Sequence, residues 1–256
     1  MEVLLLGCGS SVGSPVIGRE LDSFDSKNFR TRSSVLITEN NKNILIDTGA
    51  DFRYQALRYK IKKIDIVLYT HSHADHTHGI DDLRIFSYIK KDKINCFANN
   101  HTIRDIKKNF SYIFDPVSTS GRPRLKMKEV KDTFVEQGIN IVPVDIKHKD
   151  WDILGYRINN FAYITDCSSI PDKSMEKLGG LDLLILDSLR FSPHESHLSV
   201  DQAIEIVDIL KPKEAILTHL SSELDYYELL EYLPNNIKPG FDGLILNIQY
   251  NLKNNA

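Results

Sequence analysis

A chain of 256 residues with 41% hydrophobic and 26% charged side chains has the composition of a folded globular protein, which argues against disorder and against a fibrous chain. This length predicts one large domain or two small ones. We interpret residues 1–256 as a single domain, because no linker, repeat or low-complexity stretch interrupts them. A net charge of −3 without a charged tail argues against bulk electrostatic capture of nucleic acid or of an anionic membrane.

The start of the chain and its cysteines both favour a cytoplasmic location. No apolar run approaches the ~18 residues that a membrane helix needs, and Glu2 stands where a secretion signal would carry Lys or Arg. The three cysteines, Cys8, Cys96 and Cys167, form no C-x-x-C pair, which argues against a disulfide framework and against a cysteine zinc knuckle. The sequence therefore predicts a cytoplasmic protein without membrane contact.

Short apolar runs of Val, Ile, Leu and Tyr predict β-strands along the whole chain. Two hairpins are expected, one across residues 39–43 and one across Asn159-Asn160, because asparagine tolerates a positive φ in a tight turn. In chain order, the expected strands are Val3–Leu6, Val35–Ile37, Ile44–Ile46, Ile66–Tyr69, Ile139–Val142, Tyr163–Ile164, Leu183–Leu186 and Ala215–Leu217.

Helical spacing of apolar residues predicts helices between these strands. The clearest one runs from Val200 to Leu210, with Ser199 as a natural N-cap. Residues 9–32 and 118–131 show no regular pattern, and the second stretch is a basic loop that is either solvated or a flap over an anionic substrate. Helices that cover two packed sheets are the simplest architecture, an α/β (α+β) fold. The other expected helices are 52–59, 80–86, 103–113 and 224–233.

The strongest chemical signal is the motif His71-x-His73-x-Asp75-His76, which directly follows the strand expected at 66–69. Imidazole and carboxylate are the ligands preferred by Zn²⁺ and other borderline divalent ions. Four ligands within six residues exceed what one tetrahedral site with an open water position requires. The motif therefore predicts a centre with two metal ions.

Other strand ends repeat the same pattern. His148, Asp166 and His219 each come just beyond an apolar strand, and strand ends are rigid places that converge at one edge of a sheet. We therefore expect all three to join the histidine motif as metal ligands. Asp47 also ends a strand, and we expect its carboxylate to hold the ligand imidazoles or the metal loop in place.

In the order of these residues the chain resembles the metallo-β-lactamase fold superfamily, and the resemblance covers nearly the whole length. It implies a four-layer αββα sandwich with a dinuclear site at the edge of its two sheets. It also implies that Asp166 bridges the ions, which makes the neighbouring Cys167 a bystander. The ligand sets that it implies are His71, His73 and His148 for one ion, and Asp75, His76 and His219 for the other.

Residues 6–15, 27–34, 187–190 and 193–199 are similar to one branch of that superfamily, the PhnP-type cyclic phosphate phosphodiesterases, which are related to RNase Z. The similarity singles out His197 as the catalytic histidine, in a place where it could donate a proton to a departing alkoxide. Many members of this branch carry a cysteine-rich zinc knuckle between the first two strands. Residues 17–25 contain no cysteine, so this third metal is not expected.

Substrate contacts are expected from loops rich in hydrogen-bond donors. Ser10 and Ser11 lie in a glycine-rich loop that could meet phosphate oxygens, or that simply turns the chain after the first strand. Arg30 and Arg32 could make charge-assisted contacts to phosphate, or belong to a solvated strand entry. His194 is a further candidate for a phosphate contact, or else an ordinary loop residue.

The sequence thus predicts a phosphodiesterase that uses two divalent ions, Zn²⁺ or Mn²⁺, with Asp75 and His197 as catalytic residues. Its expected partner is a small phosphodiester, such as a ribosyl cyclic phosphate or a cyclic nucleotide, which it cleaves to a phosphomonoester. The alternatives are an RNase Z-like nuclease, which the acidic balance disfavours, a thioester or lactam hydrolase, and a non-catalytic sensor. Neither nucleic acid nor membrane is an expected partner, and a homodimer is an open alternative to a monomer.

Overall fold

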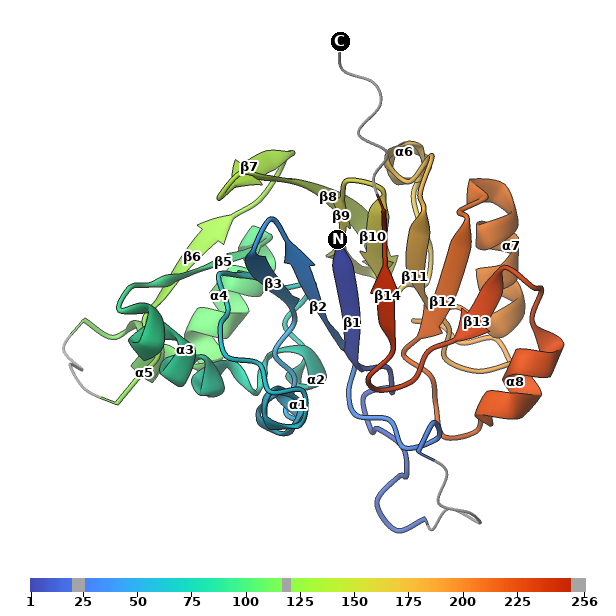
Figure 1. Cartoon of the computed structure of the whole chain (residues 1–256), viewed down its shortest axis with the longest axis horizontal. Helices are drawn as coiled ribbons and strands as arrows, with labels where there is room; N and C mark the ends of the chain where they lie inside the picture. Colours follow the sequence, from blue (N-terminus) through green and yellow to red (C-terminus); the bar gives the residue numbers. More distant parts are fainter. Residues whose placement is uncertain (20–25, 117–120, 250–256) are drawn as a thin grey trace.

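The structure is a computed structural model, and its described residues are 1–19, 26–116 and 121–249. Within these ranges the chain forms two sheets of seven strands that face one another, with helices on both outer faces (Figure 1). The four layers confirm the αββα sandwich expected from the sequence. No helix of the described part is both long and apolar enough to cross a membrane.

The first sheet has the strand order β14-β1-β2-β3-β4-β5-β6. Strands β1, β2 and β3 are antiparallel neighbours, and the predicted first hairpin is confirmed, with Asn40 and Asn41 at φ of 48° and 58° in its turn. From β3 onward the strands run parallel, because helices connect them. The strands are β1 (Glu2–Gly7), β2 (Ser34–Glu39), β3 (Lys42–Ile46), β4 (Ile66–Leu68), β5 (Ile94–Ala98), β6 (Leu125–Glu129) and β14 (Ile245–Asn247).

The second sheet has the order β13-β12-β11-β10-β9-β8-β7 and the same division into an antiparallel and a parallel half. The predicted hairpin at Asn159-Asn160 is confirmed, since Ile158 pairs with Phe161 and Asn159 has a φ of 53°. The strands are β7 (Phe134–Glu136), β8 (Ile139–His148), β9 (Trp151–Ile158), β10 (Phe161–Ile164), β11 (Leu183–Asp187), β12 (Glu214–Thr218) and β13 (Ile237–Pro239).

Helices pack on both outer faces through their apolar sides. The predicted Ser199 cap is confirmed as a capping box, in which its hydroxyl accepts from the Gln202 amide and the Gln202 side chain accepts from the Ser199 amide. On the first sheet lie α1 (Phe52–Arg58), α2 (Ala74–Thr77), the 3₁₀ turn η1 (Ile80–Asp82), α3 (Leu83–Lys90), α4 (Asn100–Asn109) and α5 (Ser111–Phe114), and on the second α6 (Asp172–Lys177), α7 (Val200–Leu210) and α8 (Tyr226–Tyr232).

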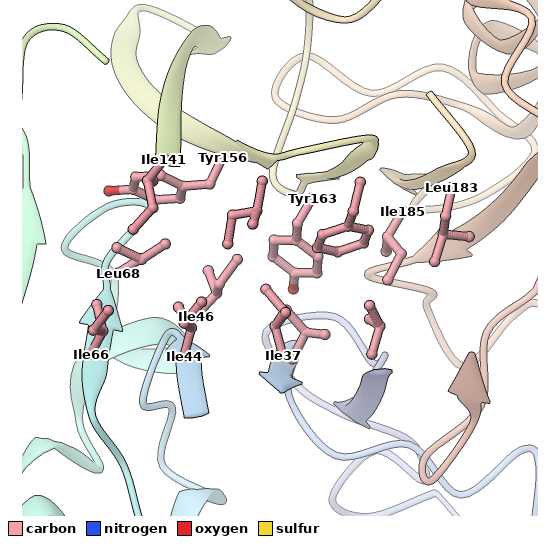
Figure 2. Close-up of a cluster of buried hydrophobic side chains, with 14 of the residues drawn as sticks. Ile37, Ile44, Ile46, Ile66, Leu68, Ile141, Tyr156, Tyr163, Leu183 and Ile185 are labelled. Atoms are coloured by element: carbon pink, nitrogen blue, oxygen red, sulfur yellow. The ribbon is translucent and has the colours of Figure 1, made fainter. Parts of the chain in front are cut away.

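The main core lies between the two sheets, where alternate side chains of facing strands interdigitate. Figure 2 shows Ile37 and Ile46 of the first sheet directed toward Tyr156 and Tyr163 of the second, and all four are fully buried. Burial of such apolar surface contributes ~25 cal/mol per Å². The packed sheets therefore make a rigid support for the loops at their edge.

One prediction about an irregular segment needs correction. Residues 125–129 of the expected basic loop form the strand β6, which pairs in parallel with β5 at the edge of the first sheet. Lys128 of this strand binds Glu136 of β7, with 2.8 Å between Nζ and Oε2. The pattern was missed because β6 alternates apolar and charged residues without a buried run. Residues 118–120 of the expected loop, and 20–25 of the stretch without cysteines, lie outside the described residues.

Candidate metal centre

The polar residues at the strand ends meet at one edge of the sandwich. Three of them, Asp47 after β3, Asp166 after β10 and His219 after β12, have left-handed backbones with φ of 65°, 55° and 60°. This conformation costs a residue other than glycine of the order of 1–3 kcal/mol, and such residues cluster at functional sites. The strained turns direct three polar side chains to the same edge.

The first ligand set brings together His71, His73, His148 and Asp166, whose ligand atoms all lie within 4.8 Å of one another. Nε2 of His71 is 3.0 Å from Nδ1 of His73 and 3.8 Å from Oδ2 of Asp166. The Nδ1–H of His148 donates to the Asp166 carbonyl at 2.9 Å. A neutral imidazole that donates through Nδ1 keeps its lone pair on Nε2, so His148 can act as a ligand.

The second set contains Asp75, His76, Asp166 and His219, again within 4.8 Å. Nε2 of His76 lies 3.2 Å from Asp75 and 3.1 Å from Oδ1 of Asp166. Nε2 of His219 lies 3.3 Å from Oδ2 of Asp166. Asp166 therefore belongs to both sets, with one carboxylate oxygen near each second-set histidine.

Buried nitrogen atoms in the second set test whether these residues fit a metal. Nε2 of His76 and both ring nitrogens of His219 are buried without a hydrogen-bond partner among the described residues. An unsatisfied buried polar atom costs about 1–3 kcal/mol. A divalent cation accepts the lone pairs of such nitrogens, so the donors of the second set fit a metal ion.

The electrostatics of the cluster also favour a cation. Burial lowers the pKa of His71 well below its usual value, which keeps this imidazole neutral and able to bind a metal. For His76, burial acts to lower the pKa, but the carboxylates of Asp166, Asp75 and Asp47 outweigh it and raise the pKa well above the usual value. The carboxylates thus attract positive charge, as a proton or as a metal ion.

Asp47 holds His76 of the second ligand set in place through a hydrogen bond. Its buried carboxylate accepts hydrogen bonds from Nδ1 of His76 and from the amide and hydroxyl of Thr70, each at 2.8 Å. These bonds fix the tautomer of His76, because its Nδ1 carries the proton and its Nε2 is left for a metal. Asp47 therefore ties the end of β3 to the residue that precedes the histidine motif.

Asp187, the last residue of β11, is a further buried acid at the site that the sequence analysis did not assign. Its buried carboxylate accepts from the amides of Asp166 at 3.0 Å and Leu198 at 2.9 Å, and lies 3.3 Å from Nδ1 of His197. It also lies 3.7 Å from Nδ1 of His219. The signal was present, because Asp187 ends an apolar strand in the same way as Asp47.

His197 stands beside the ligand sets. Its ring stacks on that of His219, with 4.7 Å between centroids, and lies 5.0 Å from the ring of His148. The ring centroid of His194 is 5.2 Å from that of His197, and Nδ1 of His194 accepts a hydrogen bond from the amide of Ser196. Both histidines therefore flank the ligand sets on the loop between β11 and α7.

The loop after β1 places the expected serines near the site. The backbone of Gly9 pairs with Leu220, the neighbour of His219, and the amide of Ser10 donates to the carbonyl of Leu220 at 3.1 Å. Ser11 is exposed, whereas Ser10 is buried. The glycine-rich loop thus reaches the edge of the metal centre.

The two expected arginine contacts have different environments. Arg32 is partly exposed and pairs with Asp51 at 2.9 Å, while its Nε donates to the carbonyl of Ser11. Arg30 is buried, and its guanidinium donates to the carbonyls of Ser221 and Leu224 at 2.9 and 2.7 Å. These bonds hold Arg30 in the interior, so the structure corrects the expected phosphate contact of Arg30 to a structural one.

A pocket of about 340 Å³ opens directly on the first ligand set. Its walls come from the turn between β8 and β9 and from the loop before α7. Trp151 is one of the residues that line this pocket. The sequence analysis did not predict it as a site residue, because a single aromatic residue belongs to no recognisable sequence motif. The lining residues are His73, His148, Lys149, Asp150, Trp151 and Ser196.

Residues 42–220 match the family model of the beta-lactamase superfamily domain. The chain belongs to the beta-lactamase superfamily. A solved structure, described as a new diphosphatase from the PhnP family, is 40% identical, with a TM-score of 0.91 over 97% of this chain and 98% of the other. This likeness confirms the PhnP branch of the superfamily that the sequence predicted.

Two curated relatives also match, but the matched region makes up only part of the length of each relative. The octanoyltransferase of Porphyromonas gingivalis is 38% identical over 95% of this chain, and the chain spans about half, 51%, of its length. The ribonuclease Z of Clostridium kluyveri is 33% identical over 85 residues, which make up 32% of this chain and 24% of the relative. Because the chain covers less than two thirds of either relative, the activity of neither is assigned to it by these matches.

Proposed function

We propose that this chain is a metal-dependent phosphodiesterase that hydrolyses a small phosphodiester to a phosphomonoester. The observation that carries the proposal is the pair of ligand sets that share Asp166, with His197 stacked beside them. Two divalent ions held there, Zn²⁺ or Mn²⁺, would lower the pKa of a water and stabilise the charge that builds on phosphoryl oxygens.

The residues of the chain divide the remaining work. Burial acts to raise the pKa of Asp75, but His76 and His219 outweigh it and lower the pKa, so Asp75 stays a carboxylate. In the proposed reaction it accepts a hydrogen bond from the attacking water and orients it. His197 donates a proton to the leaving oxygen through Nε2, because Asp187 occupies its Nδ1.

Contacts to the phosphate are proposed for the loop after β1 and for the loop before α7. Ser11 and Arg32 lie together at the edge of the site, and the exposed part of Arg32 can reach an anion despite its pairing with Asp51. Ser10 and His194 remain predicted contacts of the phosphate. The proposed partner is thus a small anion.

A diphosphate is the second candidate substrate. The 40% identical solved relative is described as a diphosphatase, and this supports cleavage of a bond at phosphorus over cleavage of a thioester or a lactam. The sequence match to the ribonuclease Z of Clostridium kluyveri covers 85 residues, and the net charge of −3 gives RNA no general attraction. An octanoyl thioester still belongs in the assay, since the other curated relative is named for octanoyl transfer.

The test is hydrolysis by protein loaded with Zn²⁺ or Mn²⁺, with products identified by mass spectrometry. We expect turnover of bis-p-nitrophenyl phosphate, of a nucleoside 2′,3′-cyclic phosphate or of a dinucleoside diphosphate, and none of an octanoyl thioester or a cephalosporin. Asp166→Asn is the control, because it removes the shared carboxylate. Thioester or lactam cleavage without phosphoester cleavage would contradict the proposal.

A further inference from the structure

Trp151 occupies an unusual place for a large aromatic residue. It is the only tryptophan of the chain, and 42% of its surface is exposed. Tryptophan is highly buried on average in folded proteins. Its indole lies beside His73 of the first ligand set, with 5.0 Å between the two ring centroids.

The hairpin geometry explains why the indole faces the site. Trp151 is the first residue of β9, and it pairs directly with His148, the last residue of β8. Side chains of directly opposed residues in an antiparallel pair stand on the same face of the sheet. Trp151 is therefore placed on the face that His148 uses to reach the ligand set.

A second aromatic ring, that of His101, lies beside the indole of Trp151. His101 lies near the start of α4, with its centroid 5.5 Å from that of Trp151, and its side chain is 55% exposed. Asp105 holds the imidazole at 3.3 Å and also accepts from the hydroxyl of Ser72 at 2.7 Å. The side chain of Asn99 donates to the carbonyl of Asp152 and so ties α4 to the hairpin.

The rim of the pocket also carries charge. Lys149 in the hairpin turn binds Glu195 in the loop before α7, with 2.8 Å between Nζ and Oε2. This pair joins the hairpin to the segment that holds His194 and His197. The pocket between these walls, about 340 Å³, is at the small end of the range for small-molecule sites.

We infer that Trp151, supported by His101, binds an aromatic ring of the substrate, so that the substrate class is a nucleotide-like phosphodiester whose base stacks on the indole. The inference rests on the proposed function for the position of the scissile phosphate. Stacking of a base on an aromatic side chain contributes about 1–3 kcal/mol. The small pocket suits one base beside the phosphate rather than a strand of RNA.

Kinetics with two cyclic substrates test the inference. We compare adenosine 2′,3′-cyclic phosphate with ribose 2′,3′-cyclic phosphate, which lacks the base, in the metal-loaded full chain. For Trp151→Leu we expect the ratio of their kcat/KM values to fall about tenfold, and for Trp151→Phe much less. Tyr54→Leu is the matched control, because Tyr54 is a comparably exposed aromatic residue on α1, and it should leave the ratio unchanged.

The single tryptophan gives a second readout that needs no turnover. Its fluorescence reports on this site alone, so AMP should quench it saturably and ribose 5-phosphate should not. His101→Ala should weaken the AMP response. Equal responses to both compounds, or an unchanged kinetic ratio in Trp151→Leu, would overturn the inference. Specific quenching by AMP without hydrolysis of any phosphoester would instead support the ring site and refute the proposed function.

Discussion

Asp187 holds His197 through Nδ1 at 3.3 Å, and the same carboxylate accepts from the amide of Asp166, the residue that both ligand sets share. One buried acid thus positions the proposed proton donor and the turn that carries the shared carboxylate. Because the Asp166 turn has a left-handed backbone, it depends on such outside support.

The first prediction concerns Asp187→Asn. The amide places a donor where one of its oxygens now accepts, so either the contact to His197 or a backbone contact is lost. Loss of such an outer contact at a metal site costs about 10–100-fold in activity or metal affinity, and we expect a decrease in kcat of this size on an alkyl phosphodiester, whose leaving group needs a proton. Asp208→Asn, on the exposed face of α7, is the control, and equal kcat values for both variants would contradict the positioning role.

The second prediction tests His197 as the proton donor. An alkoxide leaving group needs a proton as the bond breaks, whereas p-nitrophenoxide is a stable anion. We expect His197→Ala to slow hydrolysis of an alkyl phosphodiester by about 10²–10⁴-fold and that of bis-p-nitrophenyl phosphate far less. The measurement is kcat on both substrates, and an equal loss on both would assign His197 to phosphate binding instead.

The third prediction concerns the metal. Because the ligand sets belong to the folded chain and draw on distant strand ends, bound ions should stabilise the fold. Addition of Zn²⁺ or Mn²⁺ to chelator-treated protein, at about 100 times the dissociation constant, should raise Tm by about 5–10 °C. Elemental analysis should give two ions per chain. Asp166→Asn should lower both the rise in Tm and the number of bound ions. One ion per chain in the wild type would leave one ligand set without its expected role.

The sequence predicted those parts of the site that follow from strand ends. His71 to His76, His148, Asp166 and His219 each come after an apolar run, and the structure brings all of them together. The same pattern was available for Asp187, but a single carboxylate at a strand end gives no indication of which imidazole it contacts.

Other features depend on partners that are distant in the chain. Arginine side chains are mostly exposed in folded proteins. The guanidinium of Arg30 is nevertheless bound in the interior by the carbonyls of Ser221 and Leu224, about 190 residues further along the chain. The strand β6 has too few apolar residues to be predicted as a strand from its sequence. It forms by pairing with β5 at the edge of the first sheet. Trp151 gains its place at the pocket only when the β8–β9 hairpin forms.

The fourth prediction comes from a close approach between two loops. A Cβ added at Gly49 would lie 2.0 Å from the backbone carbonyl oxygen of Asp75. Gly49→Ala must therefore displace the backbone of the histidine motif, with a loss of about 1–3 kcal/mol in stability and a lower affinity for metal. In Gly179→Ala the added Cβ meets only the Glu176 carbonyl at 3.7 Å, so this control should retain both properties. Denaturant unfolding and metal titration measure the difference, and equal behaviour of the two variants would contradict it.

The last prediction concerns Asp242, whose carboxylate lies behind the loop after β1. It accepts from the amide and hydroxyl of Thr31 at 2.8 and 2.6 Å and from the amide of Cys8 at 3.1 Å. Burial raises the pKa of Asp242 to about 6, although these hydrogen bonds act to lower it. The folded protein therefore binds a proton more tightly at this position than the unfolded chain does.

The sign of the pH dependence follows from this raised pKa. Below about pH 3 the residue is protonated in both states, and between about pH 3 and 7 the unfolded chain is the more ionised, so stability falls as the pH rises. The loss attributable to Asp242 approaches about 3 kcal/mol above pH 7. Asp242→Asn does not titrate, so the free energy of unfolding of the variant minus that of the wild type should increase by about 2 kcal/mol from pH 4 to 7. Urea unfolding of both metal-free proteins measures it, since the histidine titrations cancel in the difference, and parallel curves would show that Asp242 keeps its ordinary pKa.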